Sequence, residues 1–422
     1  MTDARQSILA AFNAALTAVD PARAMATAAT REIERAQPAA IDVIAIGKAA
    51  VPMVRGAISA LGGIPHRVFI ITKDDHAVGE IDPAWTLRYS SHPVLDERSL
   101  AATSELLTWL VDGQSDRPTW CLISGGGSAL LELPIEGVSL ADFQHLTRAL
   151  LSAGADIYQL NTVRSRISQV KGGGLRSHIR SQGCTSFLLS DVLGNDPSVI
   201  ASGPTVLSTR TAADAKTVLD QFGLNDSLPT HLRNAILAEH EYRLPMGNDD
   251  RIEIVADNGT ALETAALALA DQGNVEVAWR DQTGEAADRA RVFVALLQHQ
   301  PKSVHAVLGG GELTVTVRGD GLGGRNTEFA LAAAIALRDA NLTDWAVASL
   351  ATDGQDSLTG FAGAIVDASS CTAMEAAGFD PAAELARNNS APPLEAIGAT
   401  VFPGPTGTNV NDLYLAVRTH PT

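Results

Sequence analysis

The stretch IDVIAIGKAAVPMVRGAISAL, residues 41–61, decides the fold class of this chain. Its first six residues are almost all aliphatic, and a run of that length is typical of a strand buried on both faces of a parallel sheet. Gly47 and Lys48 follow, and then comes an Ala- and Val-rich segment that we expect to be a helix. The stretch therefore predicts a strand, a tight turn and a helix.

The same alternation continues through the rest of the chain. An Ala-rich segment over residues 5–34 predicts an opening helix or helix pair. The predicted strands are Ile41–Ile46, Arg67–Thr72, Thr119–Ser124, Thr185–Ser190, Arg251–Ala256, Asn274–Arg280, Ser303–Leu308 and Trp345–Ala351. The predicted helices between them are Leu100–Val111, Ala141–Ser152, Ala261–Asp271, Glu285–Gln298 and Thr327–Arg338. Such alternation predicts an α/β protein.

Length and composition limit the domain count and the class of partner. A chain of 422 residues predicts two or three domains at roughly 150 residues each. The segment YRLPMGNDD, 242–250, interrupts the pattern, so we expect domains at 1–245 and 246–422, the second opening with a compact β-α-β-α-β run over 251–308. With 31 Lys and Arg against 48 Asp and Glu, the net charge of −17 argues against binding nucleic acid or an anionic membrane.

Cysteine usage and hydropathy indicate the compartment. The three cysteines are far apart and form no C-x-x-C motif, which excludes a disulfide framework and argues against a cysteine zinc site. No apolar run reaches the roughly 18–20 residues of a membrane span. The sequence therefore predicts a cytoplasmic location, with a monomer or homodimer as the assembly.

A triple glycine follows one of the predicted strands. In LISGGGSAL, 122–130, the residues Ser124, Gly125, Gly126, Gly127 and Ser128 connect a strand to a helix. Bare backbone N–H groups at a helix start bind phosphate, although a tight structural turn is the alternative. We favour phosphate or substrate binding, because a turn alone rarely needs three glycines in a row.

Basic residues occur at two places that suit an anionic ligand. Lys48 at a helix N-terminus opposes the macrodipole and needs a compensating anion; a surface lysine is the alternative. Arg164, Ser168 and Lys171 have the spacing of one helical face. That face predicts either an anion-binding surface or an ordinary solvated helix.

Acidic and amide residues follow other strands. Asp191 ends a buried strand, a usual position for a base or a metal ligand, but it also suits a turn cap. Asp353 in TDGQDS, 352–357, and the late TGTNVND, 406–412, combine carboxylates and amides in glycine-lined turns. Such groups suit Mg²⁺, with turn formation as the alternative for each residue.

The densest glycine region is 309–326. GGGE ends a strand, Leu313–Arg318 alternates as a further strand, and Gly319-x-Gly321-x-x-Gly324 matches the dinucleotide fingerprint in form. The match is incomplete, because the preceding strand is not continuously apolar and the acidic residue expected about 20 positions later is missing. Arg325 beside the loop instead suits a phosphoryl clamp. Phosphoryl transfer needs glycine turns that bind phosphate, basic residues and acids, and Arg325 together with Lys48 and the acidic residues supplies these groups.

Nine stretches in the same order resemble one family over nearly the whole chain. They are GKAA at 47–50, SHPVLDE at 91–97, LISGGGSALL at 122–131, NTVR…VKGGGL at 161–175, SDVLGNDPSVIASGPT at 190–205, GGGE at 309–312, GLGGRNTEFAL at 321–331, ATDGQDS at 351–357 and GTNVND at 407–412. The chain is thus similar to the class II glycerate 2-kinases, which end in a MOFRL domain. The resemblance implies a large Rossmann-like α/β/α domain, a smaller α/β (MOFRL) domain and an active site in the cleft between them.

The resemblance also implies an activity. The family transfers phosphate from ATP, with Mg²⁺, to the 2-hydroxyl of D-glycerate, giving 2-phosphoglycerate and ADP. Many members carry the label hydroxypyruvate reductase, so an NAD(P)H-dependent reductase is the alternative, and a non-catalytic binding module is a third. Two assays separate the first two, namely ADP release and nicotinamide oxidation.

By position, the resemblance places the family's functional residues on this chain. The expected catalytic residues are Lys48, Arg325 and Asp191. The expected substrate or phosphate ligands are Ser124, Gly125, Gly126, Gly127, Ser128, Arg164 and Lys171. The expected nucleotide-binding residues are Gly310, Gly311, Glu312, Gly324, Asn326 and Asn409 or Asn411, with Glu312 and Asp353 near the metal. One departure is Ser165-Arg166, where many relatives have Lys-His. We expect loss of Lys48 or Arg325 to lower kcat severely, by on the order of 10²–10³-fold, and to leave the fold intact.

Overall fold

The computed structural model of this protein describes residues 2–77, 79–113, 117–181, 183–238, 247, 249–357 and 359–419. The chain divides into two compact units. We call Pro21–Val255 the N-terminal unit, and Met1–Asp20 with Ala256–Thr422 the C-terminal unit. The predicted boundary between residues 245 and 246 lies outside the described residues and stays a prediction, as does the location of the active site.

A six-stranded sheet forms the centre of the N-terminal unit. Its strands are β1 (Ile41–Ile46), β2 (His66–Thr72), β3 (Thr86–Tyr89), β4 (Thr119–Ile123), β5 (Cys184–Leu189) and β6 (Arg251–Ala256). Their order is β3-β2-β1-β4-β5-β6, and the first five strands in this order, β3 to β5, pair with one another in parallel. β1, β4 and β5 are buried along their whole length, which confirms the prediction from their continuous apolar runs.

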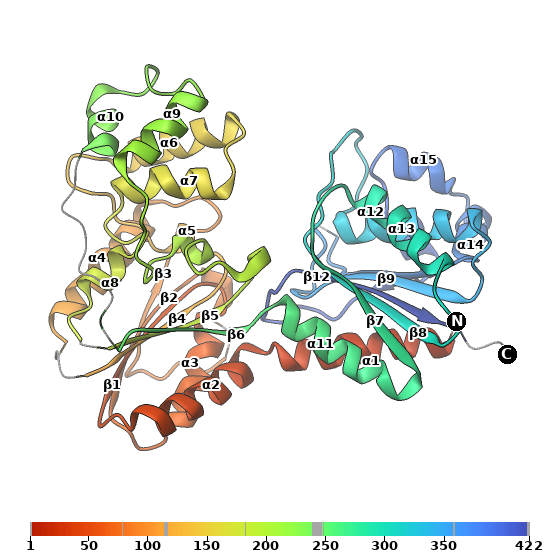
Figure 1. Cartoon of the computed structure of the whole chain (residues 1–422), viewed down its shortest axis with the longest axis horizontal. Helices are drawn as coiled ribbons and strands as arrows, with labels where there is room; N and C mark the ends of the chain where they lie inside the picture. The colour runs from red at the N-terminus through yellow and green to blue at the C-terminus, as the bar shows by residue number, and fades with distance from the viewer. Residues whose placement is uncertain are drawn as a thin grey trace. The chain divides into compact units, whose positions relative to one another are not determined.

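Helices cover both faces of this sheet (Figure 1). On one face lie α2 (Pro21–Ala36) and α3 (Ala50–Leu61), and on the other α4 (Glu97–Val111) and α8 (Gly174–His178). A further helical layer with its own apolar core contains α6 (Leu140–Ser152), α7 (Ile157–Arg164), α9 (Ala212–Gln221) and α10 (Thr230–Leu237). Side-chain capping boxes start α4, α6, α7 and α9, which fixes where these helices begin. The short α5 (Gly127–Leu130) follows β4.

The sheet of the C-terminal unit is mixed rather than parallel. Its strands are β7 (Asn274–Gln282), β8 (Val304–Gly311), β9 (Trp345–Ala351), β10 (Gly363–Asp367), β11 (Thr400–Val401) and β12 (Asp412–Arg418). The order is β11-β10-β9-β12-β8-β7. β7 and β8 are parallel, whereas β12 runs antiparallel to both of its neighbours, β8 and β9. The expectation of parallel strands is therefore wrong for most of this sheet.

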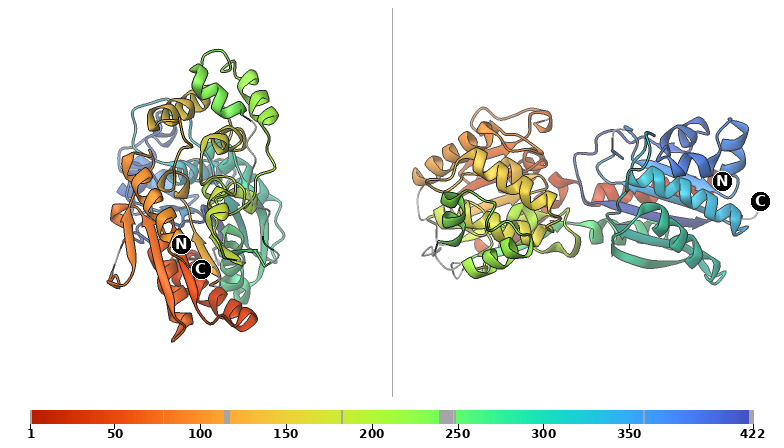
Figure 2. Two further views of the ribbon diagram at one scale, coloured as in Figure 1. Left: turned by 90° about the vertical axis from the view of Figure 1, so that its left-hand side faces the viewer. Right: turned by 90° about the horizontal axis from the view of Figure 1, so that it is seen from above.

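The helices of the C-terminal unit also lie on two faces (Figure 1). α1 (Thr2–Ala18) packs beside α11 (Asn258–Leu269) on one face, and α12 (Ala286–Gln298) and α13 (Arg325–Asp339) cover the other. Three short helices surround α13, namely α14 (Ser370–Ala376), α15 (Pro381–Ala386) and α16 (Ala391–Ala396). Figure 2 shows the red N-terminal helix among the teal and blue C-terminal elements. The opening helix pair is thus divided between the two units.

Two sequence predictions in this region are wrong. The stretch 251–308 is not one compact β-α-β-α-β run, because β6 joins the sheet of the N-terminal unit. Leu313–Arg318 is not a strand and forms only an isolated bridge between Glu285 and Thr314. The Glu285 carboxylate accepts hydrogen bonds from the backbone and hydroxyl of Thr316 at 3.0 and 2.8 Å, so side chains replace a ladder of backbone bonds.

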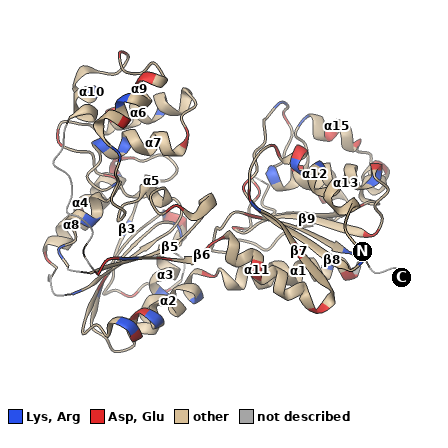
Figure 3. Ribbon diagram, viewed as in Figure 1, with Lys and Arg blue, Asp and Glu red and all other residues tan. Residues whose placement is uncertain are grey.

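Figure 3 shows basic and acidic residues interspersed over the helices of both units. Among the helices that the structure describes, none has the length and apolar character of a membrane span.

Candidate functional site

Two loops meet at the carboxyl edge of the N-terminal sheet, where the order of the strands reverses. Gly47 and Lys48 follow β1, and Ser124–Gly127 follow the neighbouring β4. The Lys48 N–H donates to the carbonyl of Gly125 at 3.0 Å, and the Ala49 N–H donates to Ser124 Oγ at 3.0 Å. Open α/β sheets bind ligands at such a point. The structure therefore brings together the lysine and the glycine turn that the sequence singled out.

The Lys48 side chain lies over the glycine turn. A β-carbon added at Gly126 would lie 3.3 Å from Lys48 Cε and 3.1 Å from His92 Cδ2, so these side chains are neighbours. In the part of the chain that the structure describes, no carboxylate lies within 4.0 Å of the Lys48 ammonium. A half-buried cation without a counter-ion suits an anionic ligand.

Two histidines next to Lys48 are held neutral. Burial, and then the positive charges of Lys48, Lys73 and His76, lower the pKa of His92 to about 4. Burial and the same two lysines also lower the pKa of His76. At neutral pH these imidazoles add no positive charge beside Lys48, and the lysine is the cation of this edge.

The low pKa of His92 predicts a pH dependence of stability. The unfolded chain protonates this imidazole near its ordinary pKa of 6.5, and the folded chain only near 4. Between these values the unfolded state binds more protons, so acid destabilises the fold. We expect the melting temperature of the wild type to fall more steeply than that of His92→Gln as the pH drops from about 6.5 to 4.

Thermal melts at several pH values check this, with the exposed His299→Gln as the matched control. Parallel curves for wild type and His92→Gln would contradict the assignment of a neutral, buried imidazole.

Asp191 completes this edge from the end of β5. A β-carbon at Gly125 would lie 2.2 Å from Asp191 Oδ2, so only glycine leaves room for the carboxylate. Burial raises the pKa of Asp191, against the opposing charge of Lys48. A carboxylate with a raised pKa near a cation is suited to accept a proton from a hydroxyl group.

Arg164 and Lys171 are buried, and the prediction of a shared helical face is wrong. α7 ends at Arg164, a 3₁₀ turn follows at Ser165–Ile167, and Ser168 is extended. Arg164 is only 7 % exposed and Lys171 1 %, so neither belongs to a solvated surface. The irregular chain after α7 places both cations in the interior instead.

A buried carboxylate, Glu132, lies between these two cations. The Lys171 ammonium is 3.1 Å from Glu132 Oε2 and donates to the carbonyls of Ser128 and Leu131 at 2.7 and 3.3 Å. Burial lowers the pKa of Lys171 and brings the pKa of Arg164 to about 10, with Glu132 opposing both shifts. Arg164 therefore keeps its charge at neutral pH, and the Glu132 carboxylate acts on both basic side chains.

Loss of the Glu132 charge is expected to destabilise the N-terminal unit. Glu132→Gln leaves the charges of Lys171 and Arg164 buried without compensation, and breaking one side of a buried pair costs about 3–5 kcal/mol. Urea denaturation measures this change, with the exposed Glu136→Gln as a control that should shift the midpoint little. A wild-type midpoint for Glu132→Gln would show that the pair contributes nothing to stability.

A second group of polar residues lies at one edge of the C-terminal sheet. Asp412, the first residue of β12, pairs with Gly311 of β8 on one side and with Ala351 of β9 on the other. Glu312 directly follows β8, and Asp353 lies just beyond β9. Because β12 runs antiparallel between these strands, its start and their ends share one edge.

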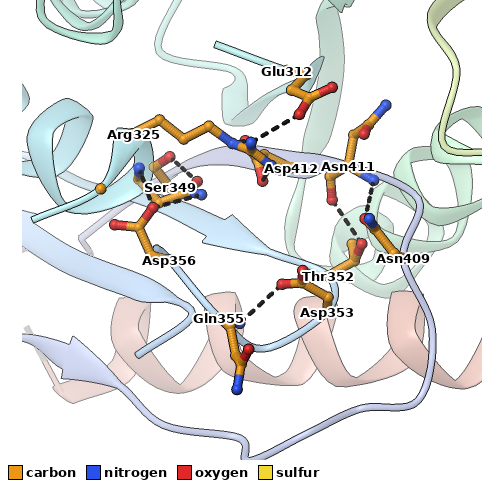
Figure 4. A network of polar contacts seen from close by, with 12 residues as sticks. Glu312, Arg325, Ser349, Thr352, Asp353, Gln355, Asp356, Asn409, Asn411 and Asp412 are labelled. Atoms are coloured by element: carbon orange, nitrogen blue, oxygen red, sulfur yellow. Dashed lines mark hydrogen bonds and ion pairs between the residues drawn. The ribbon is translucent and has the colours of Figure 1, made fainter. Parts of the chain in front are cut away.

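Arg325 is held by two carboxylates at this edge (Figure 4). Its Nε and Nη2 donate to Asp412 at 2.6 and 3.1 Å, and its Nη1 donates to Glu312 at 2.8 Å. Burial opposes its charge, but Asp412 and Glu312 outweigh burial and raise the pKa of Arg325. The Asp412 side chain is fully buried, whereas that of Glu312 is 44 % exposed. The guanidinium is therefore fixed in place and remains partly accessible.

The amides of the late motif organise the neighbouring turn. Asn409 Oδ1 accepts from the Asn411 N–H at 3.0 Å, and the Asn411 carbonyl accepts from the Thr352 hydroxyl at 2.7 Å. Asp353 Oδ1 accepts from the Gln355 N–H at 2.9 Å. Figure 4 shows this group beside Arg325 and its carboxylates. The structure brings the Asn409 and Asn411 loop to the end of β9.

Three further residues shape this edge. Asp356 and Asp412 belong to the motifs at 352–357 and 406–412, where the sequence singled out neither of them, and Asn258 lies in the helix after β6. The Asp356 carboxylate accepts from the Asn326 and Thr327 N–H groups at 2.9 and 2.7 Å and so caps α13. Asn258 donates to the carbonyls of Val410 and Asp412 at 2.8 and 3.0 Å. Only the spatial neighbours of these side chains distinguish them from ordinary turn residues.

Other predicted nucleotide-binding positions have close protein neighbours. A β-carbon at Gly310 would lie 1.8 Å from Asn258 Oδ1, and one at Gly324 would lie 2.3 Å from Asp356 Oδ1. Asn326 is buried and accepts from the Ser349 hydroxyl at 2.5 Å. Contact of these residues with a nucleotide stays a prediction.

The loop that matches the dinucleotide fingerprint packs against the chain after α15. The Gly321 N–H donates to the Arg387 carbonyl at 3.1 Å, and the Leu322 N–H donates to Asn389 Oδ1 at 2.9 Å. A β-carbon at Gly323 would lie 2.2 Å from Ser390 Oγ. The loop lies so close to residues 387–390 that its glycines have no room for a side chain. The alternating stretch before the loop, Leu313–Arg318, is not the strand that the dinucleotide fingerprint requires.

The candidate metal ligands are few. Within the described residues, no group of three or more His, Cys, Asp or Glu side chains is arranged to hold a metal ion. Glu312 and Asp353, both oxygen donors at one sheet edge, would suit Mg²⁺ that takes its other ligands from phosphate and water.

Comparison with known proteins places this geometry in a family. Residues 7–237 match a family described as Domain of unknown function (DUF4147), and residues 305–412 match the MOFRL family. A D-glycerate 2-kinase of Thermotoga maritima is 38 % identical over 89 % of this chain and 90 % of its own. The chain belongs to the family of MOFRL-domain glycerate 2-kinases.

A solved structure of the same family has the same fold. The crystal structure of glycerate kinase from Thermotoga maritima matches with a TM-score of 0.89 and 34 % identity, over 99 % of this chain and 100 % of the other. A protein of Agrobacterium vitis that is provisionally named a hydroxypyruvate reductase is 36 % identical over 97 % of this chain and 93 % of its own. The family of MOFRL-domain glycerate 2-kinases therefore includes relatives under both names.

Proposed function

We propose that this protein transfers the terminal phosphoryl group of ATP to the 2-hydroxyl of D-glycerate, giving 2-phosphoglycerate and ADP, with Mg²⁺ as cofactor. The observation that carries the proposal is the Lys48 ammonium, which lies at the switch point of the N-terminal sheet, acts on the charge of Asp191, and has no carboxylate within 4.0 Å among the described residues. An unneutralised cation next to a carboxylate with a raised pKa suits attack of a hydroxyl group on a phosphoryl group.

The residues of the N-terminal unit would bind the acceptor and activate its hydroxyl. Asp191 would accept the proton of the 2-hydroxyl, and Lys48 would bind the transferred phosphoryl group. The Ser124–Ser128 turn, Arg164 and Lys171 would bind phosphate or substrate anions. The pKa of Asp191, which burial raises against the opposing charge of Lys48, supports Asp191 as the proton acceptor.

The residues of the C-terminal unit would bind the nucleotide. Gly310, Gly311 and the Asn409–Asn411 turn would approach the nucleotide through their backbone and amides. Glu312 and Asp353 would hold Mg²⁺, which when bound supplies charge to neutralise phosphate oxygens. Arg325, fixed by Asp412, would stabilise charge on the transferred group without having to reorganise during the reaction.

The remaining parts of the proposal concern the whole protein. The domains would be 1–245 and 246–422, the location cytoplasmic, and the assembly a monomer or homodimer. Size-exclusion chromatography with light scattering measures the assembly directly.

A paired assay tests the proposed reaction against the reductase alternative. One arm measures ADP release from ATP, Mg²⁺ and D-glycerate, with the phosphate position in the product read by ³¹P NMR. The other arm measures NADH or NADPH oxidation with hydroxypyruvate. ADP together with 2-phosphoglycerate, and no nicotinamide oxidation, is the expected result. Nicotinamide oxidation without ADP release would overturn the proposal.

A further inference from the structure

Two buried hydrogen-bond donors near Ser128 have no partner within the part of the chain that the structure describes. Arg164 Nε and Asn161 Nδ2 are inaccessible to solvent and make no hydrogen bond within the described residues. Both residues belong to α7, and Asn161 is only 3 % exposed. Leaving a buried donor unpaired costs about 1–3 kcal/mol, so two together in one place require an explanation.

The oxygen of the Asn161 amide is already used, whereas both Glu132 oxygens are buried without a hydrogen bond within the described residues, and Glu132 Oε2 lies 3.1 Å from the Lys171 ammonium. Asn161 Oδ1 accepts from Arg164 Nη2 at 2.9 Å and from the Ser202 hydroxyl at 2.9 Å. Ser202 Oγ also lies 2.8 Å from Ser128 Oγ, which belongs to α5 just after the triple glycine. The cluster therefore has donors left over and lies against the glycine turn.

The backbone beside this cluster is strained at two residues. Ala201 and Ser202 have φ angles of +51° and +63°, a left-handed conformation that costs of order 1–3 kcal/mol per non-glycine residue. A β-carbon at Gly127 would lie 2.6 Å from Ala201 Cβ, so the two turns are in contact. Strain of this kind is typical of segments that position groups around a ligand.

The charge of the cluster is also unbalanced. Arg164 and Lys171 are cations, and Glu132 is the carboxylate that acts on both. The Lys171 ammonium lies 3.1 Å from Glu132, whereas no carboxylate among the described residues lies within 4.0 Å of the Arg164 guanidinium, so the charge of Arg164 calls for one compensating negative charge.

We propose that Arg164 and Asn161 bind the carboxylate of the 2-hydroxy acid. Two spare donors correspond to the two oxygens of a carboxylate, and one excess positive charge corresponds to a monoanion better than to a doubly charged phosphate. Lys171 lies 3.1 Å from Glu132 and donates to the carbonyls of Ser128 and Leu131, so it would favour the bound anion through its charge, and Glu132 would position it. The inference rests on the proposed function and identifies which end of the substrate this subsite recognises.

Calorimetric titration of the full-length protein without nucleotide tests the subsite. The probes are D-glycerate, glycerol, which lacks the carboxylate, and inorganic phosphate. We expect D-glycerate to bind and glycerol not to bind. Arg164→Gln should weaken D-glycerate binding by on the order of 10²-fold, because it removes one partner of a buried charged pair. Arg164→Lys should restore part of the affinity.

Two further variants keep the test decisive. Asn161→Asp preserves the size of the side chain and adds a negative charge, so it should abolish D-glycerate binding even if Arg164→Gln does not fold. Arg148→Gln, an exposed arginine on α6, should bind like the wild type. Wild-type D-glycerate affinity in Asn161→Asp or in folded Arg164→Gln would overturn the proposal. So would phosphate binding that depends on Arg164 while D-glycerate binding does not.

Kinetics separate this inference from the proposed function. In the ATP assay, Arg164→Gln should raise the KM for D-glycerate far more than it lowers kcat. Arg164-dependent binding of D-glycerate by a wild type that does not phosphorylate it would leave the subsite standing and reject the kinase reaction. Phosphorylation of D-glycerate by the wild type, with an unchanged KM for D-glycerate in Arg164→Gln, would support the kinase reaction and reject the subsite.

Discussion

Lys48→Ala is expected to lower kcat by about 10²–10³-fold, the usual effect of removing one preorganised charge donor, while the free energy of unfolding stays nearly unchanged. The two parts of the result have one cause. The Lys48 ammonium has no carboxylate within ion-pair distance among the described residues, so its removal breaks no ion pair in the fold. Steady-state kinetics and urea denaturation of the same preparation measure both quantities.

A neighbouring lysine supplies the control for this prediction. Lys73 also acts on the pKa of His92 but pairs with Asp75, so Lys73→Ala should change kcat little. Lys48→Arg keeps the charge and should recover part of the activity, with losses from the different shape of the guanidinium. Near-wild-type kcat/KM in Lys48→Ala would remove Lys48 from the reaction.

Arg325→Ala is expected to abolish turnover and also to destabilise the C-terminal unit, by about 3–5 kcal/mol. The expectation from sequence that the fold would stay intact is revised here. Arg325 donates two hydrogen bonds to the fully buried Asp412, and its removal leaves that carboxylate without its partner. Thermal or urea unfolding and the ADP assay report the two effects separately.

A double variant separates stability from catalysis at this site. Arg325→Ala combined with Asp412→Asn removes the buried charge together with its partner, so much of the stability should return while the activity stays lost. Asp412→Asn alone keeps the guanidinium but loosens its position, and should lower kcat more than it raises KM for ATP. Recovery of turnover in the double variant would show that Arg325 has only a structural role.

Local sequence patterns were sufficient for most of the first sheet. β1, β4 and β5 are continuous apolar runs because helices cover both of their faces, and their ends carry Gly47, Ser124 and the residues leading to Asp191. Since carboxyl ends of parallel strands share one edge, Lys48, the glycine turn and Asp191 come together as the sequence pattern suggests. That Asp191 and His92 adjoin this turn at contact distance follows only from packing.

The second sheet shows where sequence patterns were insufficient. β12 lies between β8 and β9, although 60 residues separate it from β9 in the sequence and 100 separate it from β8. No local pattern encodes such a pairing, because the alternation of apolar residues reports burial and not the identity of the neighbouring strand. The sequence therefore suggested that Arg325 binds a phosphoryl group and gave no sign of a protein partner. The position of β12 in the sheet places Asp412 against its guanidinium.

The sequence by itself determined the α/β class, the positions of the buried strands and the short segments that carry the chemistry, since burial and turn formation depend on neighbouring residues. The tertiary structure alone decided which charges are neutralised. It pairs Arg325 with Asp412 and Glu312, buries Arg164 with an excess of donors, and leaves Lys48 without a carboxylate partner among the described residues. Electrostatic energies depend on distance and burial, and those follow from how segments far apart in the chain pack together.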